Sequence, residues 1–203
     1  MEIAETYSHL NGLEWMQAKS PARLREIRQI VKAVRASDHR VYPSQAKKNR
    51  GKLLYSPVAL NKAFASAFER AEWKSSIAPY YLTRDPDLLR RCVNLPAPDQ
   101  KRLLEEAGAT IYRTSNQTDF LKNKVAVEVQ FGHYTSIAYD LFVKHMAFYI
   151  ADEIEVGVEI VPTKTMLSDM SSGPGSYEFA LHCIVRQGRS LPGVPLVVLG
   201  IEP

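Results

Sequence analysis

The chain has 203 residues, 45% hydrophobic and 24% charged, which is enough apolar material for one core. Its net charge of +4 is compatible with a nucleic-acid partner but is not that of a histone-like binder. No apolar stretch approaches the roughly 18 residues of a membrane span, and the start MEIAETYSHL lacks a signal-peptide pattern. Two cysteines give neither a disulfide framework nor metal-ligand spacing. We therefore expect one cytoplasmic domain over residues 1–203.

The first half of the chain is predicted to be mostly helical. A serine followed by a proline starts each of two helices, over about 20–36 and 56–73. Shorter helices are indicated over 85–92 and over 97–108, the second ended by a glycine. The stretch between the first two helices, about 37–54, is basic and lacks periodicity, so it is predicted to be a flexible loop.

Basic residues concentrate between residues 23 and 52, where ten lysines and arginines face one glutamate and one aspartate. Such a segment can follow a phosphate backbone, and we take Lys47, Lys48 and Arg50 as the candidates for this contact. A solvated helix face followed by a charged loop explains the pattern equally well.

The second half of the chain predicts strands alternating with helices, and hence an α/β fold with a mixed sheet flanked by helices. Glu155 and Glu159 alternate with apolar residues and are predicted to face solvent, whereas His145 lies in an apolar helix and is predicted to be a core or interface histidine. The expected strands are 117–121, 125–131, 154–162 and 194–202, the expected helices are 135–152 and 177–187, and a serine- and glycine-rich loop covers about 163–176.

A pair of carboxylates can be brought together by the strand at 125–131. Glu128 and Gln130 share one face of that strand, and if the preceding strand is its hairpin partner, Asp119 can reach Glu128. Two carboxylates side by side repel each other unless a cation such as Mg²⁺ joins them. This arrangement suits metal-dependent phosphodiester hydrolysis. Spacing alone also allows Glu128 to lie on the solvent face of an ordinary strand.

The same residues resemble a known family. Asp119, followed after eight residues by Glu128-Val129-Gln130, resembles the PD-(D/E)xK nuclease signature in the variant where glutamine replaces lysine. The segment EVQFGHY is similar to the BglII and BstYI type II restriction endonucleases, more closely to BstYI. Further similar segments follow in the same order along most of the chain, namely YSHLNGLE, LYSPVALN, NQTDF, AYDLFVKHMAFY, VGVEI, MSSG and RQGR.

The resemblance implies a restriction-endonuclease core and a homodimer in a prokaryotic cytoplasm. It implies cleavage of a palindromic duplex containing GATC, with RGATCY as the expected site, cut before the G to leave four-base 5′ overhangs. A cognate DNA methyltransferase is implied for protection of the host. Two alternatives remain at this point: a structure-specific or repair nuclease of the same superfamily, and a sequence-specific DNA-binding protein that does not cleave.

Catalytic roles are implied residue by residue. Asp119 and Glu128 match the Mg²⁺ ligands, joined by the main-chain carbonyl of Val129. Gln130 stands where the motif has lysine and, because an amide carries no charge, it can only orient the attacking water. Ser76, in the segment WKSS, matches a further polar residue near the metal and the water.

Base readout is implied for two segments. Ser171 and Ser172 match residues that read the GATC core in the major groove, although a plain glycine-serine loop would look the same. His133 stands where family members carry lysine or asparagine. Histidine can donate to guanine N7 or O6, but its reach and charge differ from those of lysine, so we expect the flanking-base preference to differ here.

Overall fold

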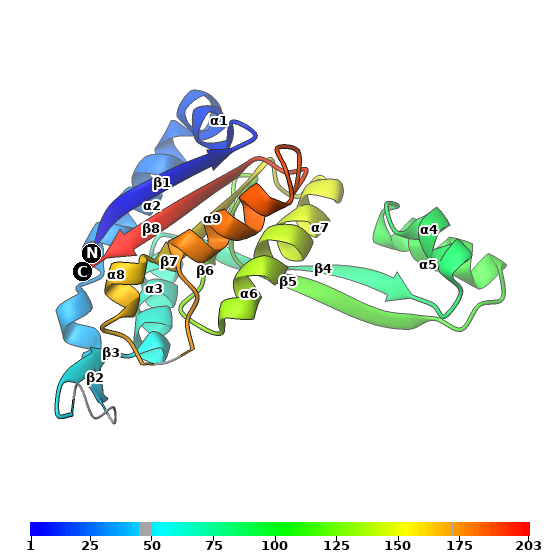
Figure 1. Ribbon diagram of the computed structural model, residues 1–203. Helices are drawn as coiled ribbons and strands as arrows, with labels where there is room; N and C mark the ends of the chain where they lie inside the picture. Colours follow the sequence, from blue (N-terminus) through cyan, green and yellow to red (C-terminus); the bar gives the residue numbers. More distant parts are fainter. Residues whose placement is uncertain (45–49, 172) are drawn as a thin grey trace.

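The computed structural model describes residues 1–44, 50–171 and 173–203. Its centre is a six-stranded mixed sheet, in which β6, β7 and β8 are parallel and the remaining neighbours are antiparallel (Figure 1). This confirms the predicted mixed α/β fold. In spatial order the strands are β1 (Glu2–His9), β8 (Leu196–Glu202), β7 (Val156–Pro162), β6 (Val125–Val129), β5 (Tyr112–Lys122) and β4 (Lys74–Leu82).

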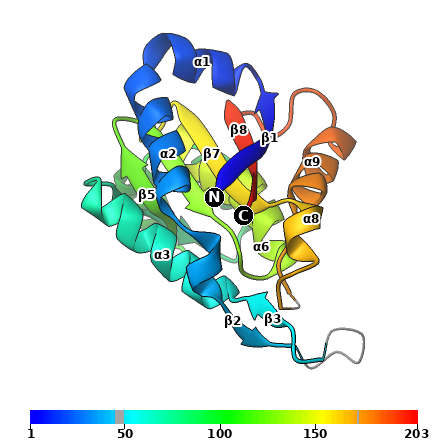
Figure 2. The same cartoon turned by 90° about the vertical axis from the view of Figure 1, so that its left-hand side faces the viewer.

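Helices cover both faces of the sheet (Figure 2). On one face Val127 and Val158 pack with Phe64 in the largest apolar core, which α1 (Gly12–Lys19), α2 (Pro21–Ala33) and α3 (Pro57–Arg70) close. Because side chains alternate along a strand, the residues between these valines face the opposite side. That side is covered by α6 (Tyr134–Tyr139), the π-helical segment η3 (Asp140–Lys144), α7 (His145–Ile150) and α9 (Tyr177–Arg186).

Strands β4 and β5 form a long antiparallel pair that continues beyond the rest of the sheet (Figure 1). Two short helices, α4 (Pro86–Cys92) and α5 (Ala97–Glu106), connect the strands at the far end. Asp85 caps α4 by accepting hydrogen bonds from the backbone N–H groups of Asp87 and Leu88. We call β4, β5, α4 and α5 together the arm.

The hairpin between β5 and β6, which was the condition for Asp119 to reach Glu128, is present. Its turn consists of Asn123 and Lys124, which both have positive φ angles, 51° and 61°. Two such residues form the tight turn that matches the twist of antiparallel strands. Phe120 pairs with Val127, and continuing this register places Asp119 opposite Glu128.

Three segments differ from the sequence prediction. The stretch at 37–54, predicted to be a flexible loop, contains the short helix η1 (Ala36–His39) and a two-stranded sheet, and residues 45–49 within it lie outside the described residues. The N-terminal strand β1 and helix α1 were not predicted. The serine- and glycine-rich loop begins with a helical turn, α8, which Thr163 caps. The bounds of the new elements are β2 (Arg40–Pro43), β3 (Leu53–Tyr55) and α8 (Lys164–Leu167).

Across the described ranges, the helices are too short or too polar for any one of them to cross a membrane.

Candidate active site

Asp119 is presented by an irregularity in β5. Lys74 pairs with Leu121 and Ser76 with Thr118, so two steps along β4 correspond to three along β5, and β5 holds one extra residue in this stretch. Bulges of this kind redirect a side chain and are frequent next to active sites. Here the Asp119 carboxylate turns towards β6, where its Oδ2 accepts a hydrogen bond of 3.3 Å from the Val129 N–H.

Glu128 is buried, with 1% of its surface exposed, so it does not lie on a solvent-facing side of β6. Its Oε2 accepts a hydrogen bond of 2.6 Å from Lys144 Nζ. Its other oxygen, Oε1, is buried without any hydrogen-bond partner. A buried carboxylate oxygen with no partner is costly, so the site has a free acceptor position that a cation could fill.

The charges of the site depend strongly on burial. Burial and the neighbouring Asp119 carboxylate raise the pKa of Glu128 to about 8, although Lys144 acts in the opposite direction. Burial also disfavours the charged form of Lys144, but Glu128 and Asp140 outweigh burial and raise the pKa of this lysine. Lys144 therefore stays protonated and is the cation nearest to the buried carboxylates.

Gln130 is held at both ends of its amide. Nε2 donates to Asp140 Oδ2 at 2.8 Å, and Oε1 accepts from the Gly132 N–H at 2.9 Å. A Cβ atom at position 132 would lie 2.6 Å from Gln130 Oε1, so only glycine allows this approach. Asp140 also accepts a hydrogen bond from Lys144, at 2.9 Å. A continuous chain of contacts therefore runs from Gly132 through Gln130, Asp140 and Lys144 to Glu128.

The helical residues in this series of contacts belong to the π-helical segment η3. Asp140 and Lys144 are its first and last residues, and the His145 N–H donates to the Asp140 carbonyl, five residues back. Single turns of π-helix inside α-helices are uncommon and are often found at functional sites. In this protein the turn places both charged side chains against the sheet, beside Gln130 and Glu128.

The donor set suits a hard divalent cation. Asp119 and Glu128 offer carboxylate oxygens, which Mg²⁺ prefers, and the unpartnered Oε1 of Glu128 is an open ligand position. Within the described ranges, no group of three or more histidine, cysteine, aspartate and glutamate side chains is arranged to hold a metal. An ion bound here would thus need ligands besides these two side chains, such as the main-chain carbonyl of Val129, water or a phosphate.

Ser76 lies on β4 directly opposite Thr118, one residue before Asp119. Its hydroxyl donates a hydrogen bond of 3.2 Å to Glu153, which follows α7. The structure therefore places Ser76 beside the strand that carries Asp119, with its hydroxyl engaged by a different acid. Its suggested role near the metal stays a prediction.

The segments predicted to read bases lie side by side. His133 is exposed just before α6, and its ring contacts the Thr135 hydroxyl at 2.9 Å. The next residue, Tyr134, donates its N–H to the Gly173 carbonyl at 3.0 Å. Ser171 in turn donates its N–H to the Tyr55 carbonyl on β3, at 3.4 Å. Ser172 lies outside the described residues.

The basic hairpin of β2 and β3 contacts the same loop through Asp169. Asp169 accepts hydrogen bonds from Arg40 and from Lys52, the latter at 2.6 Å, so these two cations are paired within the protein. Arg50 is exposed. Lys47 and Lys48 lie outside the described residues, so their predicted contact with the DNA backbone stays a prediction.

One prediction was wrong: Glu159 is fully buried and does not face solvent, whereas Glu155 is exposed. Glu159 sits next to Glu128 on the parallel strand β7, and neither of its carboxylate oxygens has a hydrogen-bond partner. The simple alternation argument failed because β7 is covered on both faces, as parallel strands are. Burial, and then the nearby carboxylates of Asp140 and Glu128, raise the pKa of Glu159 well above its ordinary value.

His145 is a buried histidine, as predicted. Its Nε2 lies 3.5 Å from Glu159 Oε2, and Gly157 makes room for the ring because a Cβ there would meet Nδ1 at 2.5 Å. Burial, and then the charge of Lys144, lower the pKa of His145 to about 3. His145 is therefore neutral and packs behind the site.

Asp140, Lys144 and Glu159 were missed by the sequence reasoning. A signal for two of them was available, because Asp140 and Lys144 are four residues apart in an otherwise apolar helix predicted to pack on the sheet. Charged residues are rarely fully buried unless they are paired.

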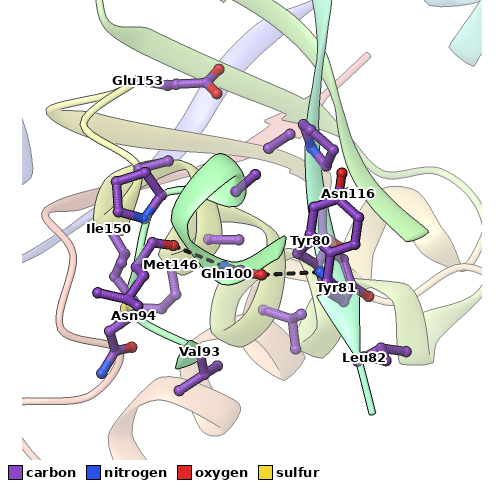
Figure 3. A pocket seen from close by; sticks show the side chains of 18 of the residues that line it. Tyr80, Tyr81, Leu82, Val93, Asn94, Gln100, Asn116, Met146, Ile150 and Glu153 are labelled. Atoms are coloured by element: carbon purple, nitrogen blue, oxygen red, sulfur yellow. Dashed lines mark hydrogen bonds between the residues drawn. The ribbon is translucent and has the colours of Figure 1, made fainter. Parts of the chain in front are cut away.

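An apolar cleft of about 590 Å³ lies between the arm and the outer side of η3 and α7 (Figure 3). Gln100 bridges its arm side, accepting from the Tyr81 N–H and donating to the Leu95 carbonyl. Met146 and Ile150 line the opposite side. Neither Asp119 nor Glu128 lines this cleft, so it is separate from the candidate active site.

We predict that Glu159→Gln makes stability less dependent on pH. The raised pKa means that folded Glu159 keeps a proton that the unfolded chain releases above its ordinary pKa of 4.5. Its contribution to the free energy of unfolding therefore falls as the pH rises above that value. Urea unfolding should show the variant gaining on the wild type as the pH rises above the ordinary pKa of glutamate. Exposed Glu155→Gln is the control, and a difference that does not change with pH would refute the explanation.

Comparison with known proteins identifies the family. The sequence model of the family described as Restriction endonuclease BglII/BglIII matches residues 4–201. The crystal structure of restriction endonuclease BglII complexed with a DNA 16-mer is 17% identical, with a TM-score of 0.65 over 100% of this chain and 79% of that chain. Free BglII is also 17% identical, with a TM-score of 0.59 over 100% and 80% of the two chains.

No curated protein sequence matches the chain. At 17% identity the structural likeness shows the fold, whereas the family match spans nearly the whole sequence. The chain therefore belongs to the BglII/BglIII family of restriction endonucleases, which are DNA-cleaving hydrolases.

Proposed function

We propose that this chain is a Mg²⁺-dependent type II restriction endonuclease that cleaves duplex DNA at a palindrome containing GATC. RGATCY is the expected site, cut before the G to leave four-base 5′ overhangs. The observation that carries the metal-dependent part is Glu128, buried beside Asp119 with Oε1 left without a partner. The enzyme would act in a prokaryotic cytoplasm, where a cognate methyltransferase protects the host.

Asp119, Glu128 and the carbonyl of Val129 would hold the ion. Bound Mg²⁺ would lower the pKa of a coordinated water and neutralise charge on the phosphoryl group. Gln130 is suited to orient that water, because its amide is fixed by Asp140 and by the Gly132 N–H. Its remaining N–H and its second carbonyl lone pair stay available for a further hydrogen bond. Ser76 is proposed as an additional polar group on the neighbouring strand.

Three segments would face the DNA: His133, the loop with Ser171 and Ser172, and the basic hairpin with Lys47, Lys48 and Arg50. The hydrogen bonds from Tyr134 to Gly173 and from Ser171 to Tyr55 support this proposal, because they hold the three segments at one end of the molecule. A base-reading loop attached to a basic hairpin combines the two kinds of contact that specific binding requires.

A homodimer is proposed, since a two-fold protein matches a palindromic site with one active site for each strand. The apolar outer side of η3 and α7 supports it. Val143, Tyr149 and Ile150 are 38–48% exposed there, and Val143 and Ile150 line the cleft beside the arm. Large apolar side chains gathered on one surface are typical of an interaction site.

The decisive experiment is a Mg²⁺-dependent digest of a plasmid of known sequence, with the cut ends sequenced. Discrete fragments ending within RGATCY support the proposal. Smearing or branch-dependent cutting would favour a structure-specific nuclease instead. Specific binding without any cutting would favour a DNA-binding protein.

We predict that Asp119→Ala abolishes cutting and leaves specific DNA binding largely intact, since the carboxylate holds the ion and does not touch bases. Removing a metal ligand should lower the cleavage rate by at least about 10³-fold. Single-turnover cleavage and filter binding in Ca²⁺ measure the two properties. Loss of binding at ordinary salt would contradict a purely catalytic role.

We predict that changing Lys47, Lys48 and Arg50 together to alanine weakens binding to every DNA sequence. Each lost phosphate contact should reduce the slope of log K against log salt by about 0.9. Binding titrations at several salt concentrations test this. The control removes Lys101 and Arg102, which are exposed on the arm helix α5. An unchanged slope would show that the hairpin charges are only solvated.

We predict that Ile150→Asp separates the dimer, because a carboxylate would have to be buried in an apolar contact. The dissociation constant of the dimer should rise at least about tenfold by sedimentation. Val185→Asp on α9, at an apolar position that is 59% exposed against 48% for Ile150, is the control and should leave the mass unchanged. A wild-type chain that sediments as a monomer, or an unaffected variant, would reject this surface.

A further inference from the structure

We propose that Lys144 is a positioning residue for the metal site. Its ammonium holds Glu128 by one carboxylate oxygen and so leaves the other oxygen alone to bind the divalent ion. It also supplies, from the helix packed on the sheet, the positive charge that Gln130 does not supply. This inference rests on the proposed metal-dependent cleavage.

The first support is that the two oxygens of the Glu128 carboxylate have different surroundings. Oε2 is taken by Lys144 Nζ at 2.6 Å, while Oε1 has no partner. The side chains of Lys144 and Glu128 are only 14% and 2% exposed, so water does not compete freely for this contact. A short, buried, charge-assisted hydrogen bond fixes the plane of the carboxylate. An ion would then meet one oxygen in a set orientation.

The second support is that the same ammonium is linked, through Asp140, to Gln130, which stands where the nuclease motif has lysine. Lys144 Nζ lies 2.9 Å from Asp140 Oδ1, and the other oxygen of Asp140 accepts from Gln130 Nε2 at 2.8 Å. Lys144 therefore contacts Glu128 directly and holds Gln130 through Asp140. One cation orients both a proposed ligand and the group proposed to orient the water.

A lysine that only neutralised buried carboxylates would not need this geometry. Such a role would be satisfied by any arrangement that spread the charge over Glu128 and Asp140. The division of the Glu128 oxygens gives a consequence that a neutralising role lacks, because the number of oxygens offered to the metal depends on the shape of the residue at position 144.

Two substitutions change that number in opposite directions. Lys144→Met removes the ammonium, so both oxygens of Glu128 become available and Mn²⁺ binding should tighten by several-fold, or about 1 kcal/mol. Lys144→Arg keeps the charge but brings a planar fork that can take both oxygens. Mn²⁺ binding to this variant should therefore weaken by at least about tenfold.

The measurement is the rise of the thermal unfolding midpoint on Mn²⁺ titration, relative to EDTA, without DNA. Lys101→Met and Lys101→Arg, at an exposed position of α5, are the matched controls and should behave as wild type. Cleavage at saturating Mg²⁺ should fall at least about tenfold in Lys144→Met, because Glu128 and Gln130 lose their orientation.

The outcomes separate the two proposals. Opposite shifts of Mn²⁺ affinity in the two variants support the positioning role. Affinity that is unchanged in the charge-conserving Lys144→Arg, which retains the buried pair and should fold, overturns it, as does wild-type cleavage by Lys144→Met. A wild-type chain that neither binds Mn²⁺ nor cuts DNA would instead overturn the proposed function, whatever the variants do.

Discussion

The structure depends on keeping acidic side chains buried between the central sheet and the helices that cover it. Glu128 and Glu159 stand side by side on the parallel strands β6 and β7, and Asp119 lies on the next strand. Ionised carboxylates in such a place repel each other and lose their hydration. The Lys144 ammonium pairs with Glu128 and offsets part of this cost. The pKa values of Glu128 and Glu159 are raised, which favours their uncharged forms. Burying these carboxylates therefore lowers the stability of the fold.

The π-helical segment η3 follows from the same constraint. A regular helix packed on the sheet would present apolar side chains, as Ile137 and Phe148 do on either side. The wider turn presents Asp140 and Lys144 at the level of Gln130 and Glu128. The irregular β5 does the corresponding task for Asp119. Both departures from regular geometry therefore occur where a polar side chain must reach the site.

Much of the fold could be predicted from local patterns. The starts of α2 and α3, the short helices α4 and α5, and the hairpin of β5 and β6 follow from helix-starting prolines, turn residues and periodicity. Ser56 also caps α3 with its side chain, whereas Ser20 makes no such hydrogen bond at α2. Strand β1 was missed because its residues are mostly polar and it lies at the sheet edge, where only pairing with β8 holds it. No local pattern encodes such a pairing.

The candidate site, too, could be predicted from the sequence only in part. Hairpin register alone brings Asp119 opposite Glu128, so this pair was accessible to sequence reasoning. Burial of Glu159 was not, because alternation gives the side of a strand and not what covers it. Lys144 required knowledge of a π-turn and of a helix packed on that side of the sheet, and both are tertiary features.

The hydrogen bonds that join the turn after Gln130, the loop around Ser171 and strand β3 have an evolutionary consequence. Under the proposed function, the groups that select the DNA sequence share one support, so a change in one displaces the others. Substitutions at His133 and Ser171 should then be epistatic, with effects that do not add. A new site preference would then require coordinated changes in all three segments. Moving one segment alone into a relative would weaken DNA recognition without changing the preferred sequence.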